Sequence, residues 1–126
     1  MENEAHRLVN DYRKSKGLKA LAYSGDVAAA SRKHSAAMAS GAAAFGHDGF
    51  DKRIKSLEKS IPYRAAAENV ATNMGYDDPA GTAVEGWIKS TGHRKNMEGD
   101  FDITGIGIAK NAKGEVYFTQ IFFKRE

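Results

Sequence analysis

The 126-residue sequence contains no cysteine and only two prolines. Because cysteine is absent, disulfides, zinc–thiolate sites and thiol nucleophiles are excluded, and any chemistry rests on histidine, carboxylates, hydroxyls and the backbone. No apolar run approaches the length of a membrane span, so we expect no transmembrane segment. The first residues, MENEAHR, have no hydrophobic signal-peptide core.

Several enzyme motifs are missing as well, among them GxSxG, HExxH and the phosphate-binding GxxxxGK sequence. Serines such as Ser35 and Ser90 have no base or oxyanion hole that the sequence identifies. The 19 basic and 16 acidic residues give a net charge of only +3, and the two signs are interleaved. The charge pattern therefore predicts no nucleic-acid partner. The missing motifs argue against the common serine-hydrolase and zinc-peptidase mechanisms.

The length corresponds to about one domain, and 41% hydrophobic with 28% charged residues is ordinary for a globular protein. We expect a single domain over residues 1–126 that acts as a monomer. Apolar residues recur at helical spacing, with glycines at 17 and 41 as stops and Asp78 before Pro79 as a start. The predicted helices cover about 2–16, 24–40, 50–57 and 79–88.

From residue 101 onward the pattern changes to glycine-punctuated alternation, with a turn at 111–114, which predicts a β-hairpin. The last strand, VYFTQIFF, is apolar on both of its alternating faces, so both faces need a covering layer. Since helices precede and separate the strands, we expect an α+β fold, a three-layer α-β-α sandwich with a central, mainly antiparallel sheet.

Four polar residues stand out in the middle of the chain: His47 in FGHDGF, Glu68 in AAAENVATN, Glu85 in VEGW and His93 in STGHRKNM. Successive members are 21, 17 and 8 positions apart, so no single helix or turn brings them together. Two imidazoles and two carboxylates would suit one polar cleft, but spacing alone does not group them.

The grouping comes from motifs that occur in a fixed order: LVNDYRKSKGLKAL, AASRKHSAAMAS, FGHDGF, ENVA, VEGWIKSTGHRKNM and YFTQIFF. In these motifs the sequence resembles the CAP family, also called SCP/TAPS or pathogenesis-related-1-like, and in particular its short cysteine-free bacterial forms. The resemblance implies the same three-layer fold and a central cleft that is lined by His47, Glu68, Glu85 and His93. It also places Asn69 beside the cleft, with a role in positioning Glu68.

The family is largely secreted, so the resemblance implies an extracellular protein from which an export signal has been removed. An intracellular form is the competing interpretation. The remaining histidine of interest, His34, lies on the apolar face of its predicted helix beside Ser35. We interpret it as a hydrogen-bonded structural histidine.

A neutral imidazole is a good ligand for zinc or a similar divalent ion, so His47 and His93 are the candidate metal ligands, with zinc as the expected cofactor. Glu68 and Glu85 then have two possible roles. Each accepts a hydrogen bond from the far nitrogen of a ligating imidazole, or holds a metal-bound water as a general base.

Three functions remain open on this basis. The first is a secreted binding domain, active in defence or in host and environment interaction, whose cleft takes a divalent cation and a small lipid-like or peptide-like ligand. The second is a metal-assisted hydrolase of the peptidase kind, in which Glu68 or Glu85 removes a proton from water. The third is an interaction module in which the four residues only brace loops.

Overall fold

The computed structural model describes residues 1–126 and contains five helices and one four-stranded sheet. The helices are α1 (Glu2–Ser15), α2 (Gly25–Ser40), α3 (Phe50–Lys55), α4 (Pro79–Lys89) and α5 (Thr91–Met97), and the strands are β1 (Ala22–Tyr23), β2 (Tyr63–Asn73), β3 (Ile103–Lys110) and β4 (Val116–Arg125). None of the helices is both long enough and apolar enough for a membrane crossing.

The sheet has the strand order β1-β3-β4-β2. The two long neighbours of β4 are antiparallel to it, whereas the short strand β1 runs parallel to β3. The hairpin expected near the C-terminus is therefore confirmed as β3 and β4. The strand β2 pairs with β4 on one side only, so its other edge is free of strand partners along its whole length.

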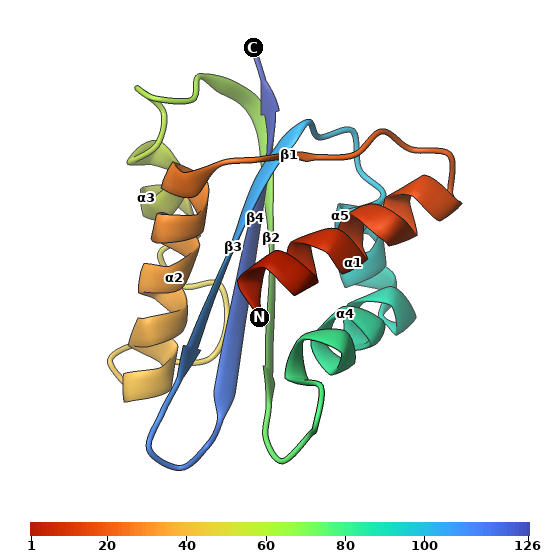
Figure 1. Cartoon of the computed structure of the whole chain (residues 1–126). Coiled ribbons are helices and arrows are strands. Elements are labelled where there is room, and N and C mark those ends of the chain that lie inside the picture. Colours follow the sequence, from red (N-terminus) through yellow and green to blue (C-terminus); the bar gives the residue numbers. More distant parts are fainter.

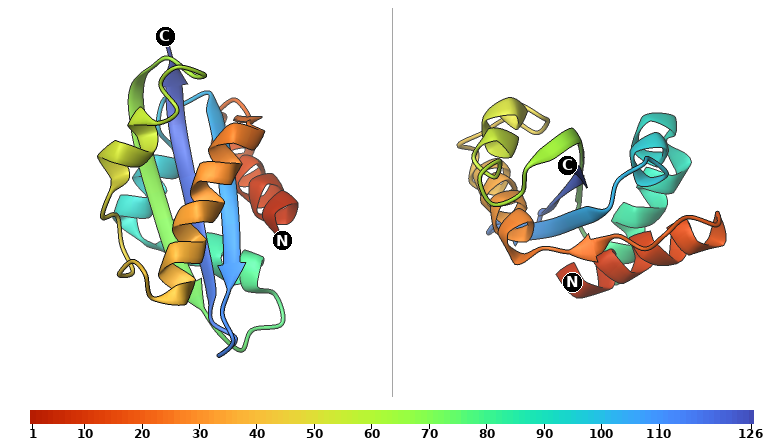
Figure 2. Two further views of the ribbon diagram at one scale, coloured as in Figure 1. Left: turned by 90° about the vertical axis from the view of Figure 1, so that its left-hand side faces the viewer. Right: turned by 90° about the horizontal axis from the view of Figure 1, so that it is seen from above.

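Helices cover both faces of this sheet (Figure 1). The pair α2 and α3 lies on one face, and α1, α4 and α5 lie on the other, as the end-on view in Figure 2 also shows. Alternating residues of β4 enter separate cores: Phe118 and Phe122 pack with Trp87 of α4, while Ile121 and Phe123 pack with Val27 of α2. The predicted three-layer α-β-α arrangement is confirmed.

The helix α2 lies unusually close to β3, because two glycines of the strand leave room for its backbone. A Cβ atom on Gly105 would lie 2.2 Å from the backbone nitrogen of Ala28, and one on Gly107 would lie 1.9 Å from that of Arg32. Hydroxyl groups of α2 also bond to the strand, with the Oγ atom of Ser31 donating to the carbonyl of Gly105 at 3.1 Å. This contact fixes the helix from which the loop with His47 departs.

The ends of α2 follow the sequence signals. The side chain of Ser24 accepts a hydrogen bond from the Val27 backbone at the N-terminus, and Gly41 ends the helix with a left-handed φ of 83°. The loop 41–49 follows, and its His47 reaches β2, where it contacts Glu68. The sequence did not predict β1 or α5, both of which are short.

Candidate functional site

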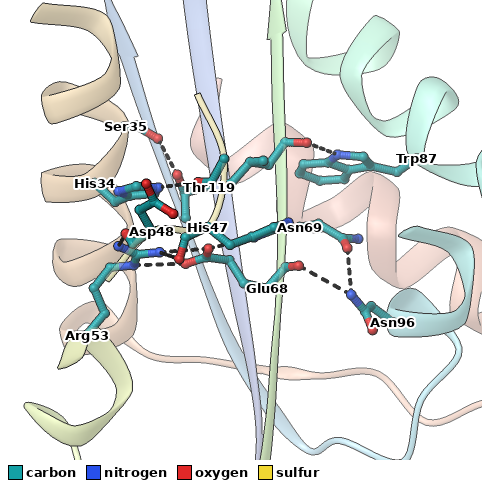
Figure 3. Close-up of polar contacts among 12 residues, drawn as sticks. His34, Ser35, His47, Asp48, Arg53, Glu68, Asn69, Trp87, Asn96 and Thr119 are labelled. Atoms are coloured by element: carbon teal, nitrogen blue, oxygen red, sulfur yellow. Dashed lines mark hydrogen bonds and ion pairs between the residues drawn. The ribbon is translucent and has the colours of Figure 1, made fainter. Parts of the chain in front are cut away.

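The carboxylate of Glu68 lies at the centre of a buried polar cluster on β2 (Figure 3). Its side chain is only 1% exposed, and Arg53 of α3 approaches it with two nitrogens, Nε at 2.9 Å from Oε2 and Nη2 at 2.8 Å from Oε1. His47 adds a third contact, because its Nδ1 lies 2.9 Å from Oε1 of Glu68. Both carboxylate oxygens are thus engaged by groups of the chain itself.

These contacts orient the imidazole of His47. An ionised carboxylate only accepts hydrogen bonds, so the proton sits on Nδ1 of the neutral ring and Nε2 carries a lone pair. The His47 side chain is 53% exposed, so this lone pair is accessible from solvent. The contact with Glu68 thus orients the His47 ring, and the other contacts of the Glu68 carboxylate are made by Arg53.

Arg53 also holds the loop that carries His47. Its guanidinium donates to the carbonyl of Asp48 at 2.7 Å and to that of His47 at 3.2 Å. Sequence reasoning missed Arg53, because its partner Glu68 is 15 positions away and lies on a different element. No spacing rule for a helix or a strand connects the two positions.

The second imidazole, His93, belongs to α5 on the opposite side of β2. Its Nδ1 lies 2.8 Å from the Oγ atom of Ser90, which is placed one turn earlier. When Nδ1–H donates to this hydroxyl oxygen, Nε2 of His93 also carries a free lone pair. Burial lowers the pKa of His93, and the charge of His47 lowers that pKa further.

An amide pair connects the strand to α5. The side chain of Asn69 is fully buried and donates to the backbone carbonyl of His93 at 3.1 Å. Asn96 in turn donates to Oδ1 of Asn69 at 2.9 Å and to the carbonyl of Glu68 at 3.3 Å. Asn69 thus anchors the backbone that carries His93, rather than contacting the carboxylate of Glu68. A signal for Asn96 was present, since it lies one helical turn after His93.

Glu85 is placed differently from the other three members of the predicted quartet. Its side chain is 65% exposed and pairs with Lys89 one turn later on α4, at 2.8 Å. The hydrogen bond and the charge of Lys89 lower the pKa of Glu85. Glu85 is bonded to neither histidine, and the side chain that approaches His93 is that of Ser90, the residue between α4 and α5. His34, by contrast, is a buried structural histidine as predicted, bonded through Nε2 to the Gly46 carbonyl.

Two hollows border β2. The smaller, of about 200 Å³, is lined by His47 and Glu68 together with Phe50, Ala67 and Asn96. The larger, of about 380 Å³, begins at His93 and Ser90 and continues over the second half of β2 toward Tyr76. The two histidines therefore line two separate hollows that both border β2.

The donor set fits a weakly held cation rather than a closed metal centre. No group of three or more His, Cys, Asp or Glu side chains converges in the structure. Each imidazole nevertheless has Nδ1 engaged and Nε2 free, which is the arrangement found in ligating histidines. A cation held by His47 and His93 would keep positions for water or for a ligand carboxylate.

The shifted pKa of His93 leads to a testable pH dependence. A folded-state pKa below the ordinary value of 6.5 means that the unfolded chain binds more protons, so this group lowers the free energy of unfolding as pH falls through 6.5 toward the folded pKa. Because the charge of His47 contributes, replacement His47→Gln should raise the pKa of His93. Titration of the His93 ring by NMR measures this directly. NMR resolves the individual rings, so His93 is distinguished from His6, whose pKa is also lowered by burial. An unchanged His93 pKa in the variant would show that the two rings do not face a common space.

Comparison with known proteins identifies one family. The family model described as "CAP: Cysteine-rich secretory protein family" matches residues 6–122. The uncharacterized membrane protein YlbC of Bacillus subtilis is 41% identical over 69 residues, which cover 54% of this chain and 18% of that protein. The match therefore spans less than a fifth of that curated relative.

Solved structures agree with the family match. An extracellular protein of Bacillus anthracis that contains an SCP domain superposes with a TM-score of 0.82 at 26% identity, over 98% of this chain and 40% of that one. An outer surface protein of Borrelia burgdorferi has the same fold, with a TM-score of 0.81 at 18% identity, over 98% of this chain and 92% of the other.

Proposed function

The chain belongs to the CAP (cysteine-rich secretory protein) family, and from this premise we propose that it is a secreted binding domain rather than an enzyme. The proposed site is the pair of hollows along β2, where His47 and His93 hold a divalent cation, zinc by preference, beside a small lipid-like or peptide-like ligand. Secretion is supported by the extracellular relative from Bacillus anthracis. A role in defence or in contact with a host or environment would follow from that location.

The observation that carries the proposal is the orientation of the two imidazoles. Glu68 fixes Nδ1 of His47, and Ser90 bonds Nδ1 of His93, so both rings leave Nε2 for a ligand. When bound, a divalent cation would supply a positive centre that attracts a carboxylate or carbonyl oxygen. The residues of the chain would orient the ligating nitrogens and shield one side of the cation from water.

The hydrolase alternative finds less support in the same contacts. A general base needs a free carboxylate oxygen within reach of the reacting water. Both oxygens of Glu68 are engaged by Arg53 and His47, and Glu85 is paired with Lys89 at the surface. Neither carboxylate is placed to remove a proton beside His93, and this favours binding over catalysis.

Calorimetric titration with zinc tests the proposal. We expect wild-type protein to bind one zinc ion with weak affinity, and we expect the heat to disappear when His47→Ala is combined with His93→Ala. Binding should weaken as pH falls, because protons compete for Nε2. The matched control is His6→Ala, which changes a histidine outside the two hollows and should leave the titration unchanged.

The same variants distinguish a binding site from a structural brace. Since the His47 side chain is 53% exposed, its truncation should cost less than about 1 kcal/mol of unfolding free energy. Equal heats for wild type and the double variant would remove the metal proposal. A loss of several kcal/mol on His47→Ala alone would favour the interpretation in which the cluster only braces loops.

A further inference from the structure

We propose that the ligand of the larger hollow is an extended peptide that pairs as an additional strand with the free edge of β2. This inference rests on the proposed binding function and specifies its ligand. The floor of the hollow is formed by residues 70–73 of β2, and its walls come from both covering layers. The hollow is therefore a groove that follows the strand edge.

The register of the sheet determines which backbone groups of β2 face this groove. In an antiparallel ladder, alternate residues bond to the partner strand, while those between them direct N–H and C=O to the opposite side. Two side-chain contacts identify the outward set: Trp87 donates to the carbonyl of Val70 at 3.0 Å, and Asn96 donates to that of Glu68. By alternation, Thr72 also directs both of its backbone groups outward, away from β4.

The outward groups are only partly satisfied within the chain. Side chains from α4 and α5 bond to the carbonyls of Val70 and Glu68, so the helices cover the middle of the edge. The amide N–H groups of Val70 and Thr72 face the groove by the same alternation, and so does the carbonyl of Thr72. Two donors and one acceptor in line along a strand edge match the backbone of an extended peptide.

The walls of the groove suit alternating side chains. Phe45, which is 53% exposed and packs against Tyr117, stands on the α2 side, and Tyr76, at 56%, closes the far end. On the α4 side the wall includes Gly86, whose missing side chain leaves open space next to the strand. A hollow that has exposed aromatic rings and an open space over a glycine in its lining has room for the side chains of a bound strand.

An aliphatic chain fits this groove less well than a peptide does. The groove is partly apolar, but its floor carries backbone N–H and C=O groups that a hydrocarbon would separate from water without replacing their hydrogen bonds. Each such group would cost about 1–3 kcal/mol. A peptide satisfies the same groups, and its acidic side chains or terminal carboxylate would also reach the His93 end.

The test uses random decapeptides displayed on phage and selected on the immobilised protein in EDTA, followed by fluorescence polarisation with the enriched sequences as synthetic peptides. We expect Thr72→Pro to weaken binding at least tenfold, because proline removes the outward N–H without removing a bond to β4. Gly86→Phe should block the groove to a similar extent. The matched control is Glu85→Phe, which places the same ring on the adjacent exposed position of α4.

Hydrogen exchange supplies a readout that does not depend on any variant. Peptide binding should slow exchange of the Val70 and Thr72 amides. Methylation of single backbone nitrogens along the peptide should abolish binding at every second position and leave it intact at the positions between. Failure to enrich any sequence, equal affinity for wild type and Gly86→Phe, or tolerance of N-methylation throughout would overturn the proposal. So would palmitate binding that Gly86→Phe blocks and Thr72→Pro leaves intact. The selection is done in EDTA and so does not depend on zinc. If no peptide binds but zinc still does, the peptide proposal fails and the metal proposal stands.

Discussion

Replacement of Arg53 by methionine is expected to lower the free energy of unfolding by about 3 kcal/mol. Arg53 makes a two-nitrogen contact with Glu68, whose side chain is 1% exposed, and is itself only 14% exposed. Methionine keeps much of the side-chain volume but leaves a buried carboxylate with His47 as its single charged or polar partner. The variant also loses the bonds that tie the guanidinium to the loop carbonyls.

Urea denaturation of the wild type and Arg53→Met measures this effect. Lys52→Met is the matched control, because Lys52 is the exposed neighbour on α3 and should change stability by less than about 0.5 kcal/mol. The double variant Arg53→Met with Glu68→Leu should recover a large part of the loss, since no buried charge then remains. If Arg53→Met were as stable as Lys52→Met, the buried ion pair would not exist as described.

Replacement of Gly107 by alanine is the second change with a large expected effect. The added methyl group would lie 1.9 Å from the backbone nitrogen of Arg32 and 2.2 Å from its Cα atom. A helix backbone cannot turn aside as a flexible side chain can, so α2 would have to move off β3. We expect a cost of about 3 kcal/mol, at the upper end of the range for overpacking, and a fall in melting temperature of about 10 °C.

Gly86→Ala is the control for this experiment, because a Cβ atom there meets nothing within 4 Å. Alanine is the better helix former, so this variant should gain about 0.5–1 kcal/mol. Thermal unfolding monitored by circular dichroism compares the two glycines directly. A melting temperature for Gly107→Ala within 2 °C of wild type, about 0.5 kcal/mol, would contradict the close approach of α2 to β3.

The parts of the fold that were predictable are those with local signals. Ser24 and Gly41 mark the two ends of α2, and Asp78 caps α4 through a bond to the Gly81 backbone. The two apolar faces of β4 predicted a layer on each side of the sheet, and both layers are present. The strand β1 and the helix α5 were not predicted, because two strand residues and seven helical ones give too little periodicity.

The site was predictable only in outline. The resemblance to the CAP family named His47, Glu68, Glu85 and His93, and the structure places the first, second and fourth of these around β2, with Glu68 bonded to His47. Glu85, which the resemblance also named, is exposed on α4 and pairs with Lys89, because a matching motif does not fix which partner a surface side chain takes. Long-range partners such as Arg53 leave no mark in one sequence, since only the folded sheet brings them to the carboxylate.

The arrangement of the site follows from the position of β2 in the sheet. An edge strand has one side free of strand partners, and here this side lies between the layer with α2 and the layer with α4 (Figure 2). Segments from both layers can therefore bring side chains to the same strand, His47 from the loop 41–49 and His93 from α5. A strand in the middle of the sheet would offer no such edge.

The most direct test of the central claim is a crystal structure of the protein grown with zinc, with anomalous differences measured at the zinc absorption edge. The account predicts one strong peak about 2.1 Å from Nε2 of His47 and from Nε2 of His93, with Nδ1 of His47 still bonded to Glu68. A peak elsewhere on the molecule, with the two imidazoles turned away from one another, would contradict it.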